Sequence, residues 1–422
     1  SKNTTGTNNT AVGRDALEVN TTGENNTAMG FEAGKANTTG SGNTAVGKDA
    51  LLTNTTGSTN TAVGLCALNA NTTASDNTAV GRGAMKLNTT GTSNVAVGRN
   101  ALQANTTSDF NTALGRDALV ANETGDGQNT AVGYQSLDSN TTGSQNVGVG
   151  VNALGANSTG VCNVSIGKSN LFANSTGACN TSMGTRSMQC NTSGDSNVAI
   201  GLCALFCNTT ADDNVAVGEI SASCNTTGAS NTAIGSAAME RVTSGSSNTA
   251  VGRLAGKGHT TGSNNTAIGL KAGCNITTGG ANVVIGDSSG ADGSMINITS
   301  ENNRAVFGHN SITNAYVKVS FTVTSDLRDK TEIGDVPHGL DFVDKLKPVS
   351  FKFKKSRENP KPHGFKKYGF LAQDILKLEG SDNVIIDNEN EESLKLTNSH
   401  LIPVLVNAIK ELSARVKELE NE

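Results

Sequence analysis

The sequence predicts a mainly β protein: a parallel β-solenoid, or β-roll, of 17-residue repeats, homotrimeric, followed by a small α+β domain that ends in a long helix. Three observations predict it. The motif NTAVG recurs at a nearly constant spacing, Gly-containing corners interrupt each repeat, and all five prolines lie beyond residue 290 together with most of the Phe and Tyr residues. Only the C-terminal part therefore has the composition of an ordinary globular core.

The Asn that opens NTAVG occurs seventeen times between Asn9 and Asn282, always at intervals of 17 residues except for one interval of 18 between Asn111 and Asn129. So constant a period predicts one solenoid turn per repeat. Each repeat holds a short run with a β-branched residue and two polar corners, which suits two short strands and two turns better than a helix. We therefore predict a solenoid stalk over residues 1–290.

Within NTAVG the Ala and the Val are adjacent, so they point to opposite faces of the strand, and both are apolar in almost every repeat. A thin solenoid buries only its inner face. The second apolar column therefore predicts a partner, most simply identical chains around an axis, and we expect a homotrimer. The repeats resemble the β-roll heads of trimeric autotransporter adhesins, whose usual period is shorter. The second column begins with Val12, Met29, Val46, Val63, Val80 and Val97.

A further Asn column opens the NTT corner, and each member also begins an N-x-S/T sequence that can accept a glycan. Two interpretations stay open: a ladder in which the side-chain amides hydrogen-bond along the stack, and a row of exposed glycans. We favour the ladder, because periodic Asn suits a solenoid corner in any case. The column comprises Asn20, Asn37, Asn54, Asn71, Asn88, Asn105, Asn122, Asn140, Asn157, Asn174, Asn191, Asn208 and Asn225.

The eight cysteines also follow the repeat: Cys162 and Cys179 are 17 residues apart, as are Cys190, Cys207 and Cys224. We expect free thiols that act as small buried apolar residues, with disulfide cross-links within or between chains as the alternative. The sequence has no C-x-x-C pair and no His cluster, so neither a metal nor a cofactor is expected.

Charge and hydropathy exclude several classes of function. The net charge is −5, and no basic cluster is interleaved with aromatic residues, so nucleic acid is not an expected partner. No apolar run approaches about eighteen residues, so we expect no membrane insertion. The sequence begins without Met or a signal-type segment, and we interpret it as the C-terminal part of a longer protein. The repeats carry no carboxylate pair of the kind that glycoside hydrolases use.

Beyond residue 290 the repeat decays into β-branched residues, which predict a β neck over 291–324. The tail, 325–422, then presents four separated motifs in order. They are SDLRDK (325–330), GLDFVDKLKPVSF (339–351), GFLAQ (369–373) and LIPVLVNAIKEL (401–412). With these motifs the tail resembles the intramolecular chaperone auto-processing domain at the C-terminus of endosialidase and related bacteriophage tail spikes and fibres.

The resemblance implies a domain that helps the preceding stalk to trimerise and then cuts itself off between Thr324 and Ser325. Ser325 would be the nucleophile and Lys330 the general base, with Asp326 and Arg328 as positioning residues. An amine can take a hydroxyl proton when burial or nearby positive charge lowers its pKa. Single-turnover autoproteolysis is the one enzymatic activity expected.

Two observations qualify the motif. By itself SDLRDK is also typical of an ordinary capped turn with solvated charges. Asp329 departs from the family, which often carries an apolar residue before the lysine, and this places the efficiency of cleavage in question.

Apolar residues alternate three and four positions apart along the C-terminal segment, which predicts a helix over about 398–421 with a heptad seam. Pro403 falls in the first turn, where proline is tolerated. A helix this short is marginal alone, so we expect it to form a trimer contact, with a generic core helix as the alternative. The seam residues are Ile402, Leu405, Ile409, Leu412, Val416 and Leu419.

Together these features indicate the stalk of a viral, phage-like tail fibre or tail spike that serves host attachment and is located extracellularly on the virion. Its expected partners are further copies of itself and a host surface glycan or protein receptor. The alternative is a bacterial cell-surface trimeric adhesin that carries the same C-terminal module.

Overall fold

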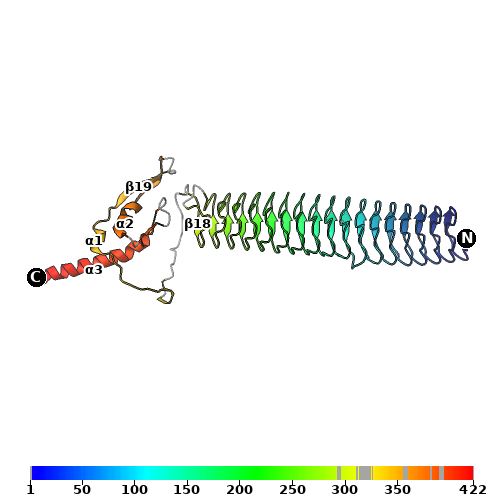
Figure 1. Cartoon of the computed structure of the whole chain (residues 1–422), viewed down its shortest axis with the longest axis horizontal. Coiled ribbons are helices and arrows are strands. Elements are labelled where there is room, and N and C mark those ends of the chain that lie inside the picture. Colours follow the sequence, from blue (N-terminus) through cyan, green and yellow to red (C-terminus); the bar gives the residue numbers. More distant parts are fainter. Residues whose placement is uncertain are drawn as a thin grey trace. The chain divides into compact units, whose positions relative to one another are not determined.

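The computed structural model describes residues 2–291, 296–309, 312, 325, 327–354, 360–380, 383–388 and 394–421. The chain divides into two compact units, Ser1–His309 and Asn310–Glu422, and each is described by itself. The first unit is a regular stack of coils (Figure 1). This confirms the predicted parallel β-solenoid.

Each coil contributes one strand of three residues to a single parallel sheet of 18 strands, so the prediction of two strands per repeat is wrong. The remainder of the coil is turn, because residues such as Asp117 (φ 56°) and Leu119 (φ 50°) adopt the left-handed conformation that ends a strand. The strands are β1 (Thr10–Val12), β2 (Thr27–Met29), β3 (Thr44–Val46), β4 (Thr61–Val63), β5 (Thr78–Val80), β6 (Val95–Val97), β7 (Thr112–Leu114), β8 (Thr130–Val132), β9 (Val147–Val149), β10 (Val164–Ile166), β11 (Thr181–Met183), β12 (Val198–Ile200), β13 (Val215–Val217), β14 (Thr232–Ile234), β15 (Thr249–Val251), β16 (Thr266–Ile268), β17 (Val283–Ile285) and β18 (Ala305–Phe307).

The register is the same throughout, so equivalent residues of successive coils stack on one another. Ala96 pairs with Ala113, and Thr112 pairs with Thr130 across the one 18-residue repeat. The inserted residue is therefore absorbed in a corner and does not shift the sheet. Beyond the last NTAVG-type repeat, β18 still pairs with β17, within the first part of the predicted neck. Most of the neck after residue 309 lies outside the described residues.

The solenoid core is built from small and unbranched side chains. From β2 onward the middle residue of each strand, such as Ala96, is buried, and so is the Leu that lies in the left-handed turn, such as Leu102 (φ 52°). The column of that Leu contains Leu, Met, Ala and Gly but no β-branched residue, since a β-branched side chain is strained at positive φ. The Gly that follows each strand is required too: at Gly98 (φ 138°) a Cβ atom would lie 2.3 Å from the Gly115 carbonyl oxygen.

The Asn column of the NTT corner forms the predicted hydrogen-bonded ladder. Asn105 Nδ2 donates to Asn88 Oδ1 (2.7 Å) and to the Ser108 carbonyl (3.0 Å), while Asn105 Oδ1 accepts from Asn122 Nδ2 (3.0 Å). The side chain of Asn105 is fully buried. The ladder interpretation is confirmed, since a glycan needs an Asn amide that reaches solvent and has no competing partner.

A second ladder, which the sequence did not lead us to predict, runs along the Asn of NTAVG. The backbone N–H of Asn111 donates to Asn94 Oδ1 (2.8 Å), and Asn94 Nδ2 donates to the Ser108 carbonyl (2.9 Å). Both ladders satisfy polar groups inside the stack, where an unpaired amide or carbonyl would be costly.

Asn105→Ala should destabilise the solenoid by about 1–3 kcal/mol, because it leaves Asn122 Nδ2 and Asn88 Oδ1 buried without their partner. Thermal unfolding followed by circular dichroism measures the effect. Gln103→Ala, on the same coil, is the matched control, since the Gln103 side chain makes no hydrogen bond within the described residues. Equal melting temperatures for the two variants would show that the ladder contributes nothing to stability.

The NTT ladder ends after Asn225, because the following coils place Val242, His259 and Ile276 in its column. His259 is fully buried, and neither ring nitrogen has a hydrogen-bond partner within the described residues. Burial away from water lowers the pKa of His259 to about 4. The ring is therefore neutral in the folded solenoid near pH 7.

We expect the solenoid to lose stability as the pH falls from about 6.5 toward 4. In this window the unfolded chain protonates its histidine, whereas folded His259 binds a proton only near pH 4, so protons favour the unfolded state by on the order of 3 kcal/mol at the acidic end. His259→Ile, which copies Ile276 of the next coil, should flatten this part of the pH profile. Melting temperatures at pH 7, 5.5 and 4.5 test it, and an identical fall in the variant would exclude His259 as the cause.

The cysteines differ from the prediction in one respect. All eight are thiols rather than disulfides, but none is buried: Cys162, Cys179 and Cys224 are exposed and the other five are half-buried. The prediction of small buried apolar residues is therefore wrong. Their columns lie in the corners and turns of the coil, whereas the core columns are filled by Ala, Leu and Asn.

The second unit is a small α+β domain, as predicted. The hairpin-like pair β19 (Val349–Lys354) and β20 (Pro362–Gly369) is antiparallel, and so is the short pair β21 (Ile386–Asp387) and β22 (Lys395–Leu396). The helical elements are η1 (Leu327–Asp329), α1 (Leu340–Val343), α2 (Ala372–Glu379), η2 (Asn398–His400) and α3 (Leu401–Glu420). The core of this unit comprises Phe342, Ile375, Ile385, Ile386, Leu401 and Val404.

Candidate functional site

The structure brings Ser325 and Lys330 into contact. Lys330 follows the single 3₁₀ turn η1, whose geometry is closed by a hydrogen bond from the Lys330 N–H to the Leu327 carbonyl (3.2 Å). This turn folds the chain back, so that Lys330 Nζ lies 2.7 Å from Ser325 Oγ and donates a hydrogen bond to it. The residue types that the sequence singled out as nucleophile and base are thus at hydrogen-bonding distance.

The other predicted residues of this site are placed only in part. Arg328 lies in η1 with an exposed side chain, and Asp329 contributes its backbone to the same turn. Thr324 and Asp326 lie outside the described residues, as does the side chain of Asp329. The cleavage and positioning roles assigned to these residues therefore stay predictions.

Ser325 and Lys330 are both exposed in the single chain. The hydrogen bond runs from the amine to the hydroxyl, whereas activation of the hydroxyl requires the reverse: a neutral amine that accepts the Oγ proton. Removal of the pair from water favours the neutral amine. Ser325 Oγ and Lys330 Nζ therefore lie at a distance that suits activation of the nucleophile, and covering the pair would favour transfer of the hydroxyl proton to the amine.

Three polar residues that the sequence analysis did not identify hold the surrounding domain together. The buried carboxylate of Glu379, at the end of α2, accepts hydrogen bonds from three successive backbone N–H groups at 384–386 (2.6–3.0 Å). Glu411 of α3 accepts from the Leu340 N–H at the start of α1 (2.8 Å), and Asn407 Nδ2 donates to the His338 carbonyl (3.0 Å). Asn407 and Glu411 lie within the motif LIPVLVNAIKEL, but the motif does not reveal these contacts, because each partner group is backbone.

Helix α3 uses two separate faces. Leu401, Val404 and Ala408 are buried against the rest of the unit. The predicted heptad seam lies on a different face, and its members are between 43 % and 72 % exposed. The seam is therefore not part of the intrachain core. A continuous exposed apolar seam is typical of a single helix of a coiled coil without its partner helices.

The solenoid also has an exposed apolar face. From β2 onward the first and third side chains of each strand point outward, opposite to the buried middle residue, and the third side chain is Val, Ile, Leu, Met or Phe in every coil. Apolar stripes of this length are uncommon on the surface of a monomer. The most exposed members are Val12, Met29, Leu114, Ile166, Met183, Ile200, Ile234, Ile268, Ile285 and Phe307.

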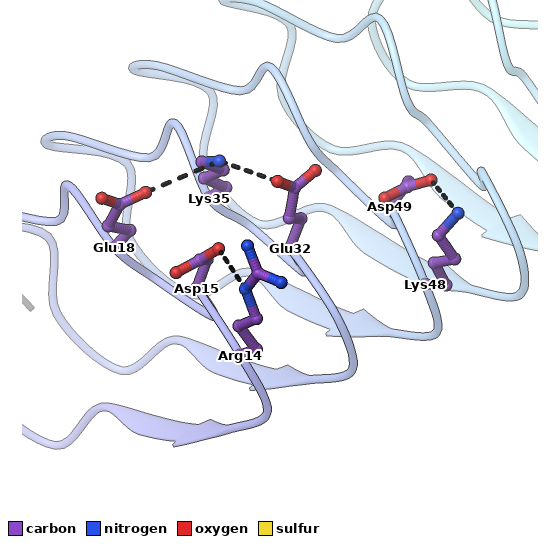
Figure 2. Close-up of polar contacts among 7 residues, drawn as sticks. All are labelled: Arg14, Asp15, Glu18, Glu32, Lys35, Lys48 and Asp49. Atoms are coloured by element: carbon purple, nitrogen blue, oxygen red, sulfur yellow. Dashed lines mark hydrogen bonds and ion pairs between the residues drawn. The ribbon is translucent and has the colours of Figure 1, made fainter.

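The turns that follow the first strands form a second face of the solenoid, here called the turn face. In the first coils this face is polar, and its charged side chains are paired. Arg14 and Lys48 each form an ion pair with the Asp that follows in sequence, at 3.3 and 3.5 Å (Figure 2). Lys35 bridges two coils, with Glu32 at 2.8 Å and Glu18 at 3.6 Å, and the hydrogen bond to Glu32 is the main cause of a raised Lys35 pKa. Charges in this part of the stack are thus largely neutralised by their neighbours.

Neither a metal centre nor a membrane span is found in the described ranges. The His, Cys, Asp and Glu side chains there include no group of three suited to a metal ion. None of the helices there combines the length and the hydrophobicity that a membrane crossing requires.

One region of the chain matches a known protein family. Residues 325–384 match a family model described as chaperone of endosialidase. The match begins at Ser325, the hydroxyl partner of Lys330, and supports a chaperone domain of this kind at the C-terminal end of the solenoid chain. No curated protein and no solved structure matches the chain.

Proposed function

We propose that residues 325–422 form an intramolecular chaperone that assembles three chains and is then released by cleavage between Thr324 and Ser325. The remaining solenoid would be the mature product, a phage-like tail-fibre or tail-spike stalk on the virion that serves host attachment. The observation that carries the proposal is the hydrogen bond between Lys330 and Ser325 at the first residue of the chaperone match.

The proposed cleavage is an acyl shift followed by hydrolysis. Ser325 Oγ attacks the Thr324 carbonyl carbon while Lys330 Nζ accepts the hydroxyl proton and passes it to the departing Ser325 nitrogen. The new Oγ–C ester replaces the C–N bond, and the Ser325 amine becomes free. Water then hydrolyses the ester, which yields a Thr324 carboxylate and restores the Ser325 hydroxyl.

Two exposed apolar surfaces support assembly into a homotrimer: the seam on α3 and the outer face of the solenoid sheet. Three α3 helices that pack through their seams would fix the chains in register before the long stacks form. Parallel strand pairings between distant residues form slowly and expose edges, so a domain that sets the register first would limit aggregation. Trimer formation would also cover the Ser325–Lys330 pair if a neighbouring chain packs over it, and this would link cleavage to assembly.

The chaperone role predicts that the timing of tail removal matters. Expression of residues 1–324 without the tail should yield mostly aggregated chain, because the register-setting domain is absent. Release of the tail from an already folded trimer should leave the stalk soluble and trimeric, since separated strands cannot easily exchange. Size-exclusion chromatography with light scattering measures both, and equal yields of soluble trimer would refute the chaperone role.

Sequencing the region encoded upstream of residue 1 tests the attachment role. A particle-attachment domain encoded upstream would support a viral fibre, whereas an export signal and a membrane anchor would favour the bacterial surface adhesin.

A further inference from the structure

A groove of about 470 Å³ lies on the turn face near the C-terminal end of the solenoid. Its lining residues come from the turns that follow β14, β15, β16 and β17, so it crosses four successive coils. None of them belongs to the outward face of the sheet. Contacts between chains through the sheet face would therefore leave the groove accessible.

Three cationic side chains line this groove: Arg241, Lys257 and Lys271. Lys257 forms an ion pair with Glu240 (3.1 Å). Within the described part of the chain, Arg241 and Lys271 pair with no carboxylate, in contrast to Arg14 and Lys48 in the first coils (Figure 2). Arg241 and Lys271 thus line a concave surface without forming an ion pair among the described residues, and this favours an anionic ligand.

The groove also offers neutral polar groups. Asn275 and Ser288 line it, and their side chains already bond to Asn297 (2.9 Å) and Asp287 (3.0 Å), which fixes their positions. Leu254 and Ala291 supply apolar wall. The volume lies in the range of small-molecule sites and exceeds what a bare inorganic anion fills. Amide and hydroxyl groups beside a short apolar wall suit the hydroxyls and ring carbons of a sugar.

We propose that this groove binds an acidic saccharide, with a carboxylate or phosphate group of the sugar between Arg241 and Lys271 and its hydroxyls toward Asn275 and Ser288. A planar guanidinium can hold two oxygens of either group, while the lysine ammonium adds a point charge. The proposal depends neither on cleavage at Ser325 nor on trimer formation.

Isothermal titration calorimetry of the full chain at low salt tests the proposal with four probes: glucuronic acid, glucose 6-phosphate, glucose and inorganic phosphate. The two acidic sugars separate the carboxylate source from the phosphate source, and at least one of them should bind. Glucose, which lacks the charge, should show no heat of binding. Inorganic phosphate should bind at least about tenfold more weakly than the acidic sugar that binds, because it makes no sugar contacts.

Arg241→Ala and Lys271→Ala should each weaken binding roughly tenfold, the loss of one charge-assisted contact. Both side chains are exposed, so the melting temperature should stay unchanged and report intact folding. Arg82→Ala and Arg99→Ala remove exposed arginines from other coils and are the matched controls. The proposal is overturned if neither acidic sugar binds, if glucose or inorganic phosphate binds as tightly as they do, or if the controls lose as much affinity as the groove variants.

Discussion

Ser325→Ala is expected to leave the chain at its full mass of 42.9 kDa, whereas the unsubstituted chain should yield a stalk that ends at Thr324 and a tail that begins with Ser325. The substitution removes the only atom in the proposed mechanism that can form the ester, so cleavage should fall to background rather than decline partially. Intact-mass spectrometry after expression and incubation resolves the three species directly.

Lys330→Ala should have the same effect, because it removes the group that accepts the Ser325 proton. Lys345→Ala, an exposed lysine of the same domain, is the control and should be cut like the unsubstituted chain. Trimer formation should persist in all three variants, since none alters an apolar surface. Cleavage of Ser325→Ala at the normal rate would eliminate Ser325 as the nucleophile.

Replacement of both Ile409 and Leu412 by Asp should abolish the trimer. These side chains are 65 % and 49 % exposed in the single chain and lie at the centre of the seam, so the substitutions leave the intrachain core intact. In a three-helix contact they would bury two carboxylates per chain without partners, at a cost of several kcal/mol for each charge. Sedimentation equilibrium on chains refolded at low concentration reports the assembly state.

Lys410→Glu controls for the change in charge on α3. It lies on the same helix with an exposed side chain outside the seam, and it should leave the trimer unaffected. If the double Asp variant still assembles, the seam is not the trimer contact and the proposal for α3 fails.

The period of the repeat made most of the solenoid predictable. A constant interval requires equivalent residues to stack, so the parallel sheet and the ladder of Asn105 and its neighbours follow from the sequence. The number of strands per coil did not follow, because the left-handed conformations of residues such as Leu119 leave only a weak signature, the absence of β-branched side chains in one column. The substitution of His259 into the Asn column was visible in the sequence but was not recognised.

The candidate sites, too, were predictable from the sequence only where their residues lie close together in it. Ser325 and Lys330 were identified because their motif is short and local, and a single 3₁₀ turn is enough to bring them together. The groove around Arg241 and Lys271 was not identified, since its lining residues belong to three columns of the repeat that come together only when four coils are stacked. Even a regular repeat can thus build an irregular site through substitutions that break its pattern.

We propose that the tail assembles three chains before it is cut from them. Native mass spectrometry of samples taken throughout expression tests this order most directly. We expect uncut single chains, uncut trimers and cut trimers, with cut chains appearing only in assemblies of three. A substantial population of cut single chains would contradict it, because cleavage would then precede the assembly that the tail is proposed to direct.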